Sequence, residues 1–344
     1  MSEKICNALS PSASVNQERL WQRHMEMAKI GGTNLGGVNR QALSPEDARA
    51  QLLMIAWAND RKFACYTDAV GNLFIRREGS VPDVPPVVAG SHLDSQPNGG
   101  KFDGASGVLA AFEALEAICD QNIVTKRPIE VVSWTNEEGS RFELGCMGST
   151  AFSDPTKLEM LLAQKDASGI TAAAALAEVK QMLPGLPERP LGFPIDSFLE
   201  LHIEQGRRLE IEQKTIGIVT EIQGSRKFII EVIGEDAHSA TTPASARKDA
   251  LFAAVDVVIA LRKLMRDPTE DIRFTIGRFE VLPGSLNVVP SQVVFTIDLR
   301  HPEETVLTAL GDQIEQVCRA NAGPCSVLFT DLKRNPVQNL KDRL

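Results

Sequence analysis

Histidine and acidic side chains gather in two segments of the sequence. The run GSHLDSQPNGGKFDG contains His92, Asp94 and Asp103, and the run WTNEEGSRF contains the adjacent pair Glu137 and Glu138. Imidazole nitrogens and carboxylate oxygens are common protein ligands of zinc and manganese. A further carboxylate can take a proton from an attacking water. These residue types therefore predict a hydrolytic centre that uses two divalent metal ions.

The first run places an aspartate two residues after His92. At a strand end, residues two apart share a face, so we expect Asp94 to hold the ring of His92, fix its tautomer and raise its basicity. Asp103 follows a Gly-Gly turn, which lets the backbone approach a ligand closely, and a carboxylate there can bridge two ions. The residues alone leave an alternative open, in which Asp103 caps the helix that begins near Ser106.

Glu137 and Glu138 are adjacent at a predicted strand end, so their side chains diverge. One can bind a metal ion while the other acts on the attacking water. A solvated acidic turn is the alternative, although Trp134 and a largely apolar strand precede the pair. His202 follows the strand-like run 197–201. It becomes a ligand candidate only together with the other residues, because a lone histidine in such a place is more often structural.

The segments between these residues predict the elements that position them. Strands alternate with helices up to about residue 212, which predicts an α/β sheet covered by helices. In such sheets ligands lie beyond the carboxyl ends of the strands, where both runs fall. One helix opens at Ser44-Pro45, an N-cap followed by proline at the first helical position. The other predicted elements are strands at 72–76, 87–89 and 129–134 and helices at 18–30 and 106–119.

The pattern changes after residue 212. Two strands, a helix, two strands, a helix and a final strand predict a compact α+β domain. We expect a mobile N-terminal arm over 1–17, a catalytic domain over 18–212, a second domain over 213–330 and a tail over 331–344. The elements expected in the second domain are a strand pair at 216–221 and 227–233, a helix at 246–265, strands at 272–280 and 292–299, a helix at 303–320 and a strand at 326–329.

The composition argues against several classes of function. With 344 residues, 43% of them hydrophobic and 24% charged, the chain is typical of a globular protein with a large core. A net charge of −9 without a basic run argues against nucleic-acid binding. No apolar stretch is long enough to span a bilayer, and residues 1–17 lack an apolar signal core, so we expect a cytoplasmic protein with no membrane partner. None of the cysteines forms a Cys-x-x-Cys pair, which argues against a structural zinc site.

Four motifs together resemble one enzyme family. They are HLD at 92–94, GGKFDG at 99–104, TNEEGSRF at 135–142 and HIEQG at 202–206. This set is similar to the zinc-dependent amidohydrolases of the aminoacylase/carboxypeptidase-like clan. The branch is that of N-carbamoyl-L-amino-acid hydrolase, β-ureidopropionase and allantoate amidohydrolase. The resemblance runs from about residue 18 to about residue 330, and the peptidase relatives have an aspartate in place of His202.

The resemblance implies a ligand set, a fold and an assembly. It places His92, Asp103 and His202 at one ion and Asp103 and Glu138 at the other, with Glu137 as general base. The ions would be zinc or manganese. The implied fold is a di-zinc peptidase-like catalytic domain with a mixed sheet covered by helices, plus an α+β, ferredoxin-like lid and dimerisation domain. The implied assembly is a homodimer.

The resemblance also implies substrate-binding residues, most of them in the second domain. His238, in GEDAH, would polarise the scissile carbonyl and usually reaches the partner subunit's site. Asn287, in GSLNVVP, would bind substrate. Arg300, in DLR, would clamp the substrate carboxylate, a task suited to the bidentate guanidinium. Gln205 would also contact substrate.

Two features depart from the family pattern. The small-residue run after His238 reads SATTP at 239–243, which affects only local loop shape. In the family, the chain then returns to the catalytic domain, where a Gly-His-Asp segment supplies the last metal histidine, on the side of Glu138. This sequence has no histidine after His301, which adjoins Arg300. We therefore expect an incomplete second metal site and an incomplete catalytic sheet.

The expected reaction is hydrolysis of an N-carbamoyl amino acid, L-α or β, to the amino acid, ammonia and carbon dioxide. Glu137 would take the water proton, and His238 would help to stabilise the oxyanion. Allantoate or another ureido acid is the alternative substrate, and a peptide is disfavoured by His202. An alternative of another class is an inactive fragment that only binds metal or forms dimers.

Overall fold

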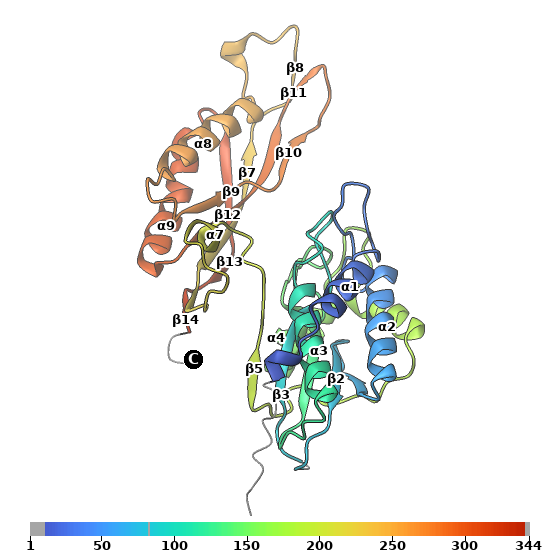
Figure 1. Cartoon of the computed structure of the whole chain (residues 1–344). Coiled ribbons are helices and arrows are strands. Elements are labelled where there is room, and N and C mark those ends of the chain that lie inside the picture. The colour runs from blue at the N-terminus through green and yellow to red at the C-terminus, as the bar shows by residue number, and fades with distance from the viewer. Residues whose placement is uncertain (1–10, 82, 341–344) are drawn as a thin grey trace, which may run out of the picture. The chain divides into compact units, whose positions relative to one another are not determined.

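The computed structural model describes residues 11–81 and 83–340 (Figure 1). Backbone contacts divide the chain into two compact units, Met1–Arg207 and Arg208–Leu344, here called unit 1 and unit 2. Each unit has its own sheet and its own hydrophobic core. No helix in the described ranges is both long and apolar enough to cross a membrane.

Unit 1 is built on a mixed five-stranded sheet. Its strands, in spatial order, are β1 (Ala64–Thr67), β2 (Leu73–Arg77), β4 (Ile129–Trp134), β3 (Val87–His92) and β5 (Ser197–Leu199). The β1–β2 and β2–β4 pairs are antiparallel, whereas β3 runs parallel to both β4 and β5. β4 and β3 are largely buried, whereas β5 is an exposed edge strand, and the predicted mixed α/β sheet is confirmed.

Helices cover both faces of this sheet. Alternation along the strands sends Ile75 and Val131 into a core with α1 (Gln17–Met27), α2 (Pro45–Asp60) and α3 (Ala105–Asp120). The opposite face carries Phe74, Val132 and Trp134, which pack with Phe152. The other helices of unit 1 are α4 (Met147–Ser153), α5 (Leu158–Leu162) and α6 (Ala172–Met182), with 3-10 turns at Pro11–Ser14 and Pro155–Lys157.

The start of α2 follows its predicted capping chemistry. The Ser44 side chain accepts a hydrogen bond from the Asp47 amide at 3.2 Å, and Pro45 is the first helical residue. The serine satisfies a backbone amide that the helix itself leaves unpaired, and the proline has no backbone N–H that would need a partner.

Unit 2 is an antiparallel sheet covered by two helices. Its sheet has the spatial order β10 (Phe279–Leu282), β12 (Gln292–His301), β7 (Gly224–Ile233) and β13 (Ser326–Asn335), with β9 (Arg273–Thr275) also paired to β12. The helices α8 (Ala250–Leu264) and α9 (Glu304–Asn321) share one core with β7 and β12 (Figure 1). In chain order this is β-α-β-β-α-β with sheet order 2-3-1-4, the ferredoxin-like arrangement expected. The remaining elements are α7 (Arg208–Ile211), β6 (Glu221–Ile222), β8 (Ala237–His238), a 3-10 turn at Ala244–Ala246, β11 (Val288–Val289) and β14 (Gln338–Asn339).

The predicted strand pair at the start of unit 2 is wrong. β7 pairs with β12 and β13, and only β6 remains of the strand predicted at 216–221, paired with β14. The reason lies in burial. β7 alternates buried and half-buried side chains, so it fits the centre of a sheet that covers a core on one face. Ile216 and Ile218 are largely exposed and have no such face to cover.

Three other predicted boundaries differ from the structure. The strand predicted at 272–280 is divided into β9 and β10 around Gly277, a residue that weakens strand interiors. The tail predicted from residue 331 is instead the second half of β13. Within the arm predicted at 1–17, the Asn16 amide donates to Glu113 Oε1 at 2.7 Å, so this part is anchored to α3. Residues 1–10 of that arm lie outside the described residues.

Candidate metal centre

The sheet of unit 1 brings the motif residues to one edge. β4, β3 and β5 are parallel neighbours, so their carboxyl ends lie side by side. His92 ends β3, the pair Glu137 and Glu138 follows β4, and His202 follows β5. Asp103 stands just before α3, in the loop that follows β3. The position predicted for both runs is therefore confirmed.

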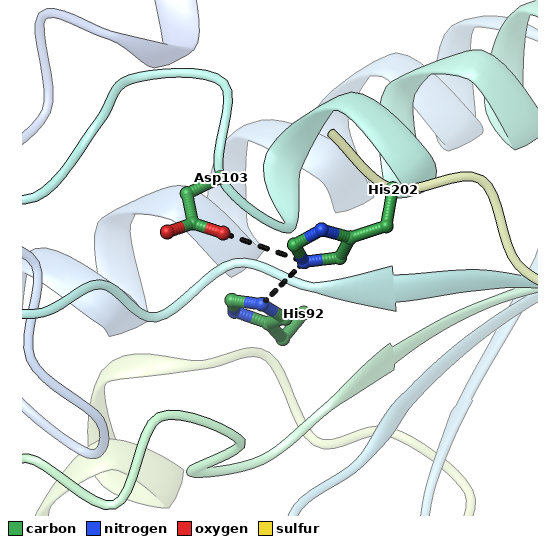
Figure 2. A group of neighbouring side chains, drawn as sticks. All are labelled: His92, Asp103 and His202. Carbon is green, nitrogen blue, oxygen red and sulfur yellow. Dashed lines mark hydrogen bonds and ion pairs between the residues drawn. The ribbon is translucent and has the colours of Figure 1, made fainter. Parts of the chain in front are cut away.

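His92, Asp103 and His202 form one compact group (Figure 2). Each offers a ligand atom within 4.8 Å of the others. The Nε2 atoms of the two histidines are 3.5 Å apart, and His202 Nε2 lies 3.3 Å from Asp103 Oδ1. His92 and Asp103 are buried, whereas the His202 side chain is 31% exposed. The group is therefore closed to solvent at His92 and Asp103 and more open at His202.

Hydrogen bonds to backbone carbonyls place a proton on Nδ1 of both His92 and His202. His92 Nδ1 lies 2.9 Å from the Asp94 carbonyl oxygen, and His202 Nδ1 lies 2.9 Å from the Ile203 carbonyl oxygen. A carbonyl only accepts, so both Nδ1 atoms carry the proton and both neutral rings present an Nε2 lone pair. When both rings are neutral, two lone pairs and a carboxylate oxygen therefore converge. The residues fit a divalent cation, which would satisfy all three.

The electrostatics around His92 also favour a cation. Burial opposes protonation of His92, but the carboxylates of Asp94 and Glu137 outweigh it, and the pKa of His92 is raised. The negative potential that stabilises a proton on this ring would equally stabilise a bound metal ion.

Gly104 lets the Asp103 loop close onto His92. It adopts φ +60°, and a Cβ atom at this position would lie 2.3 Å from the His92 ring. Gly104 is the N-cap of α3, which has no side-chain capping hydrogen bond. The alternative in which Asp103 caps this helix is therefore wrong, because its carboxylate faces His202 instead.

Asp94 supports the centre differently from the prediction. Its backbone carbonyl, rather than its carboxylate, accepts the hydrogen bond from His92, and the carboxylate lies 3.7 Å from the ring nitrogen. The two carboxylate oxygens instead accept the amides of Glu137 and Glu138, each at 3.2 Å. Burial raises the pKa of Asp94, and these bonds oppose the rise. Asp94 thereby ties the loop after β3 to the loop after β4.

The two glutamates occupy different environments. Glu137 is partly exposed, and its Oε2 lies 3.4 Å from His92 Nε2. Glu138 accepts a hydrogen bond from Gln96 Nε2 at 2.9 Å through Oε2, while its Oε1 is buried without a partner among the described residues. Burial is the main cause of the raised pKa of Glu138. A fully solvated acidic turn is therefore the wrong description of this pair.

Several neighbours of the centre escaped the sequence reasoning. Gln96 bonds Glu138, and the Cys146 thiol lies 3.5 Å from Glu137 Oε1. Gln96 stood in the first run, where its amide among the acids was the available signal. Nothing in the sequence signalled Cys146, which a loop after β4 brings back to Glu137. Gln205, predicted to contact substrate, donates from Nε2 to Asp103 Oδ2.

His238 and Asn287 lie together in unit 2. β8 pairs with β11, with His238 opposite Val288, and the Ser239 amide donates to the Asn287 carbonyl at 3.1 Å. His238 is exposed, and its Nδ1 accepts the Ala240 amide at 3.2 Å. The neutral ring therefore carries its proton on Nε2 and can donate it to an oxyanion.

Arg300 lies at the other end of unit 2's central strands. It stands near the end of β12, opposite Ser225, whereas the β8–β11 pair adjoins the start of that strand. At about 3.3 Å per residue, the eight steps from Gln292 to Arg300 span roughly 26 Å. The guanidinium is paired with Asp298 through Nε and Nη2, at 3.1 and 2.9 Å. Unit 2 does not bring Arg300 together with His238.

A covered mixed sheet with a His/Asp/His group at the carboxyl edge of its parallel strands is the arrangement expected of a metal-dependent hydrolase. Residues 88–321 match the family described as Peptidase family M20/M25/M40, and the chain belongs to that family.

Three similar proteins place the chain within this family. An N-carbamoyl-L-amino-acid amidohydrolase of Rhizobium meliloti is 36% identical over 318 residues, 91% of this chain and 76% of that protein. An allantoate amidohydrolase of Bacillus subtilis is 35% identical over 281 residues, 82% and 68% of the two chains. The crystal structure of an amidase of the hydantoinase/carbamoylase family from Burkholderia vietnamiensis has a TM-score of 0.85 and 40% identity, covering 96% of this chain and 80% of that one. The resemblance stated from the motifs is confirmed.

Removing one ligand should weaken metal binding sharply. His202→Ala takes away one of three convergent donors, and we expect the dissociation constant for Zn²⁺ to rise more than about 100-fold, beyond the effect of losing an outer partner. Titration of the metal-free protein against a chromophoric chelator would measure it. His301→Ala, which removes a histidine from unit 2, should bind as the wild type does. Unchanged affinity in His202→Ala would contradict the assignment.

Adding a methyl group at Gly104 should disturb the centre directly. The Cβ atom of Gly104→Ala would collide with the His92 ring, so we expect a loss of about 1–3 kcal/mol in the free energy of unfolding and weaker metal binding. Urea unfolding and the same chelator titration would measure both. Gly100→Ala is the matched control, because its Cβ would lie 3.9 Å from the nearest atom. Equal effects at the two positions would refute the steric argument.

Proposed function

We propose that the protein hydrolyses linear amides, converting an N-carbamoyl amino acid to the amino acid, ammonia and carbon dioxide. The observation that carries this proposal is the convergence of His92 Nε2, His202 Nε2 and Asp103 Oδ1 beside the partly exposed carboxylate of Glu137. The substrate class is supported by the names of the relatives, which act on carbamoyl and ureido compounds.

We assign the ligands as follows. His92, Asp103 and His202 hold one divalent ion, zinc or manganese. Asp103 and Glu138 hold the second, and the buried, unbonded Oε1 of Glu138 supports this role, because such an atom is costly to leave unsatisfied. When bound, the ions supply Lewis acidity toward the amide carbonyl and the attacking water.

Glu137 is the proton carrier in this scheme. Its carboxylate lies next to the buried ring of His92 yet remains partly exposed, so it can contact both water and substrate. It accepts the proton of the attacking water and then delivers it to the leaving amine nitrogen. Cleavage of this first C–N bond leaves a carbamic acid, which loses carbon dioxide and thereby releases the second nitrogen product. One water is consumed overall: its oxygen ends in carbon dioxide, and its two hydrogens end on the amino acid nitrogen and on ammonia.

The second unit supplies substrate contacts in this proposal. His238 donates from Nε2 to the developing oxyanion, Asn287 binds beside it, and Arg300 pairs with the substrate carboxylate. Residues 18–212 would form the catalytic domain and residues 213–330 the lid and dimerisation domain. Gln205 would reach substrate from the Asp103 side.

The separation within unit 2 supports a homodimer. An N-carbamoyl amino acid is far shorter than the roughly 26 Å along β12 between the His238 end and Arg300. One unit 2 therefore cannot place both on the same substrate molecule. We propose that His238 and Asn287 of one protomer and Arg300 of the other complete each site.

Allantoate is the second candidate substrate. The allantoate amidohydrolase of Bacillus subtilis has nearly the same identity to this chain as the carbamoylase does. Both reactions attack the carbonyl of a ureido group, so the metal centre serves either. The pocket that surrounds the rest of the substrate would decide between them.

A substrate panel with one variant tests the proposed chemistry. Metal-loaded protein should release ammonia from an N-carbamoyl-L-amino acid, N-carbamoyl-β-alanine or allantoate, and the preferred one identifies the substrate. Glu137→Gln should lower kcat by about 10²- to 10⁴-fold, the usual contribution of a general base, while binding metal normally. Glu143→Gln, an exposed glutamate in the same loop, should keep full activity. Full turnover by Glu137→Gln would refute its role.

Mixing two inactive variants tests the shared site. His238→Ala and Arg300→Ala should each be nearly inactive. After unfolding, mixing and refolding in equal amounts, half of the dimers are hybrids with one intact site of two, so about a quarter of the wild-type activity should return. No recovery, with hybrids verified by mass spectrometry, would place both residues at one protomer's site.

A further inference from the structure

A buried arginine, Arg40, contacts the turn that follows His92. Arg40 is 1% exposed and is among the largest fully buried side chains of the protein. Its Nε donates to the Leu93 carbonyl at 2.7 Å, and its Nη1 donates to the carbonyls of Met27 and Ile30 at 3.2 and 2.9 Å. The guanidinium thus joins the end of α1 to the residue between His92 and Asp94.

The backbone of Arg40 holds the same turn from a second side. The Arg40 amide donates to Ser95 Oγ at 2.9 Å, and the Ser95 amide donates to the Arg40 carbonyl at 2.8 Å. Ser95 is itself buried. Both neighbours of Asp94 are therefore fixed by one residue. The Asp94 carboxylate accepts hydrogen bonds from the amides of Glu137 and Glu138. A shift of this turn would therefore displace both His92 and the loop that contains the two glutamates.

The charge of Arg40 is costly where it lies. No ion pair in the described ranges includes Arg40. Burial lowers its pKa, and the negative charges of Asp47 and Asp94 oppose that shift. Moving a charged group out of water is costly unless the group is both paired and hydrogen-bonded, and Arg40 has hydrogen bonds but no ion pair. Stability alone therefore gives a weak reason for an arginine at this position.

We propose that Arg40 is a positioning residue of the metal centre, which fixes the turn from His92 to Ser95 through the Leu93 carbonyl and both backbone bonds to Ser95. It touches neither substrate nor metal. The inference rests on the proposed metal centre, because the turn that Arg40 holds carries His92. The forked guanidinium reaches three carbonyls at once, which the single ammonium of lysine cannot do in the same geometry.

Metal affinity of the folded protein tests this role. We expect R40K and R40M to raise the Zn²⁺ dissociation constant of the full chain about 10- to 100-fold, the usual effect of losing a partner behind a metal ligand. Chelator competition would measure the affinity, and circular dichroism at the same temperature would verify folding. The activity of R40K should recover with excess Zn²⁺ or Mn²⁺, whereas that of Glu137→Gln should not.

The matched control is another buried arginine. Arg226 is 6% exposed in unit 2, where it pairs with Asp312 and Asp331 at 2.6 and 2.7 Å. R226K and R226M should lower the unfolding temperature and leave metal affinity unchanged. If they weakened metal binding as much as R40K does, the effect would be one of general stability and the proposal would be overturned.

Ser95→Ala keeps the test decisive if the Arg40 variants do not fold. It removes the acceptor of the Arg40 amide with a small change in volume and should weaken metal binding in the same direction. Wild-type affinity in Ser95→Ala and in every folded Arg40 variant, with His202→Ala impaired, would overturn the role of Arg40 alone. Wild-type affinity in His202→Ala as well would instead refute the proposed metal centre.

Discussion

Two imidazole nitrogens and a carboxylate oxygen converge at the carboxyl edge of the sheet, and in the neutral rings both nitrogens present lone pairs. Two backbone carbonyls force the protons of His92 and His202 onto Nδ1, and the Asp103 carboxylate adds a negative charge to the two remaining lone pairs. Such an arrangement repels itself unless a cation is bound. Much of unit 1 serves to hold it: parallel strands deliver the side chains to one edge, Gly104 allows the close approach, and buried bonds fix the loops between them.

Two buried polar groups that are not among the proposed metal ligands hold these loops. Asp94 carries two amides of the loop after β4, and Arg40 fixes the turn on either side of Asp94. Each of these groups is buried, so its hydrogen bonds do not compete with water. The centre therefore depends on polar contacts at the margin of the hydrophobic core, where a lost partner leaves an unsatisfied group.

Much of this is readable from the sequence, because strand-forming residues and helix caps act locally. The β-branched residues at 129–134 predict β4, the capping residues Ser44 and Pro45 predict the start of α2, and motif residues at strand ends locate His92 and His202. Contacts between distant segments are not readable. Nothing local shows that the Asp94 carboxylate binds amides beyond β4, that Arg40 reaches the Leu93 carbonyl, or that β7 pairs with β12 and β13. Each of these depends on tertiary packing that overrides local pattern.

The three proposed ligands are unequally buried. This difference bears separately on how tightly a metal ion would be held and on how quickly it would be exchanged. His92 is sealed and Asp103 is almost sealed, whereas His202 is one-third exposed and follows a three-residue strand whose side chains are all exposed. The two buried side chains are the less accessible part of the group, so an ion bound there would exchange on the side of His202. How tightly an ion is held then depends on all three donors, but how quickly it is replaced depends on the freedom of the segment after β5.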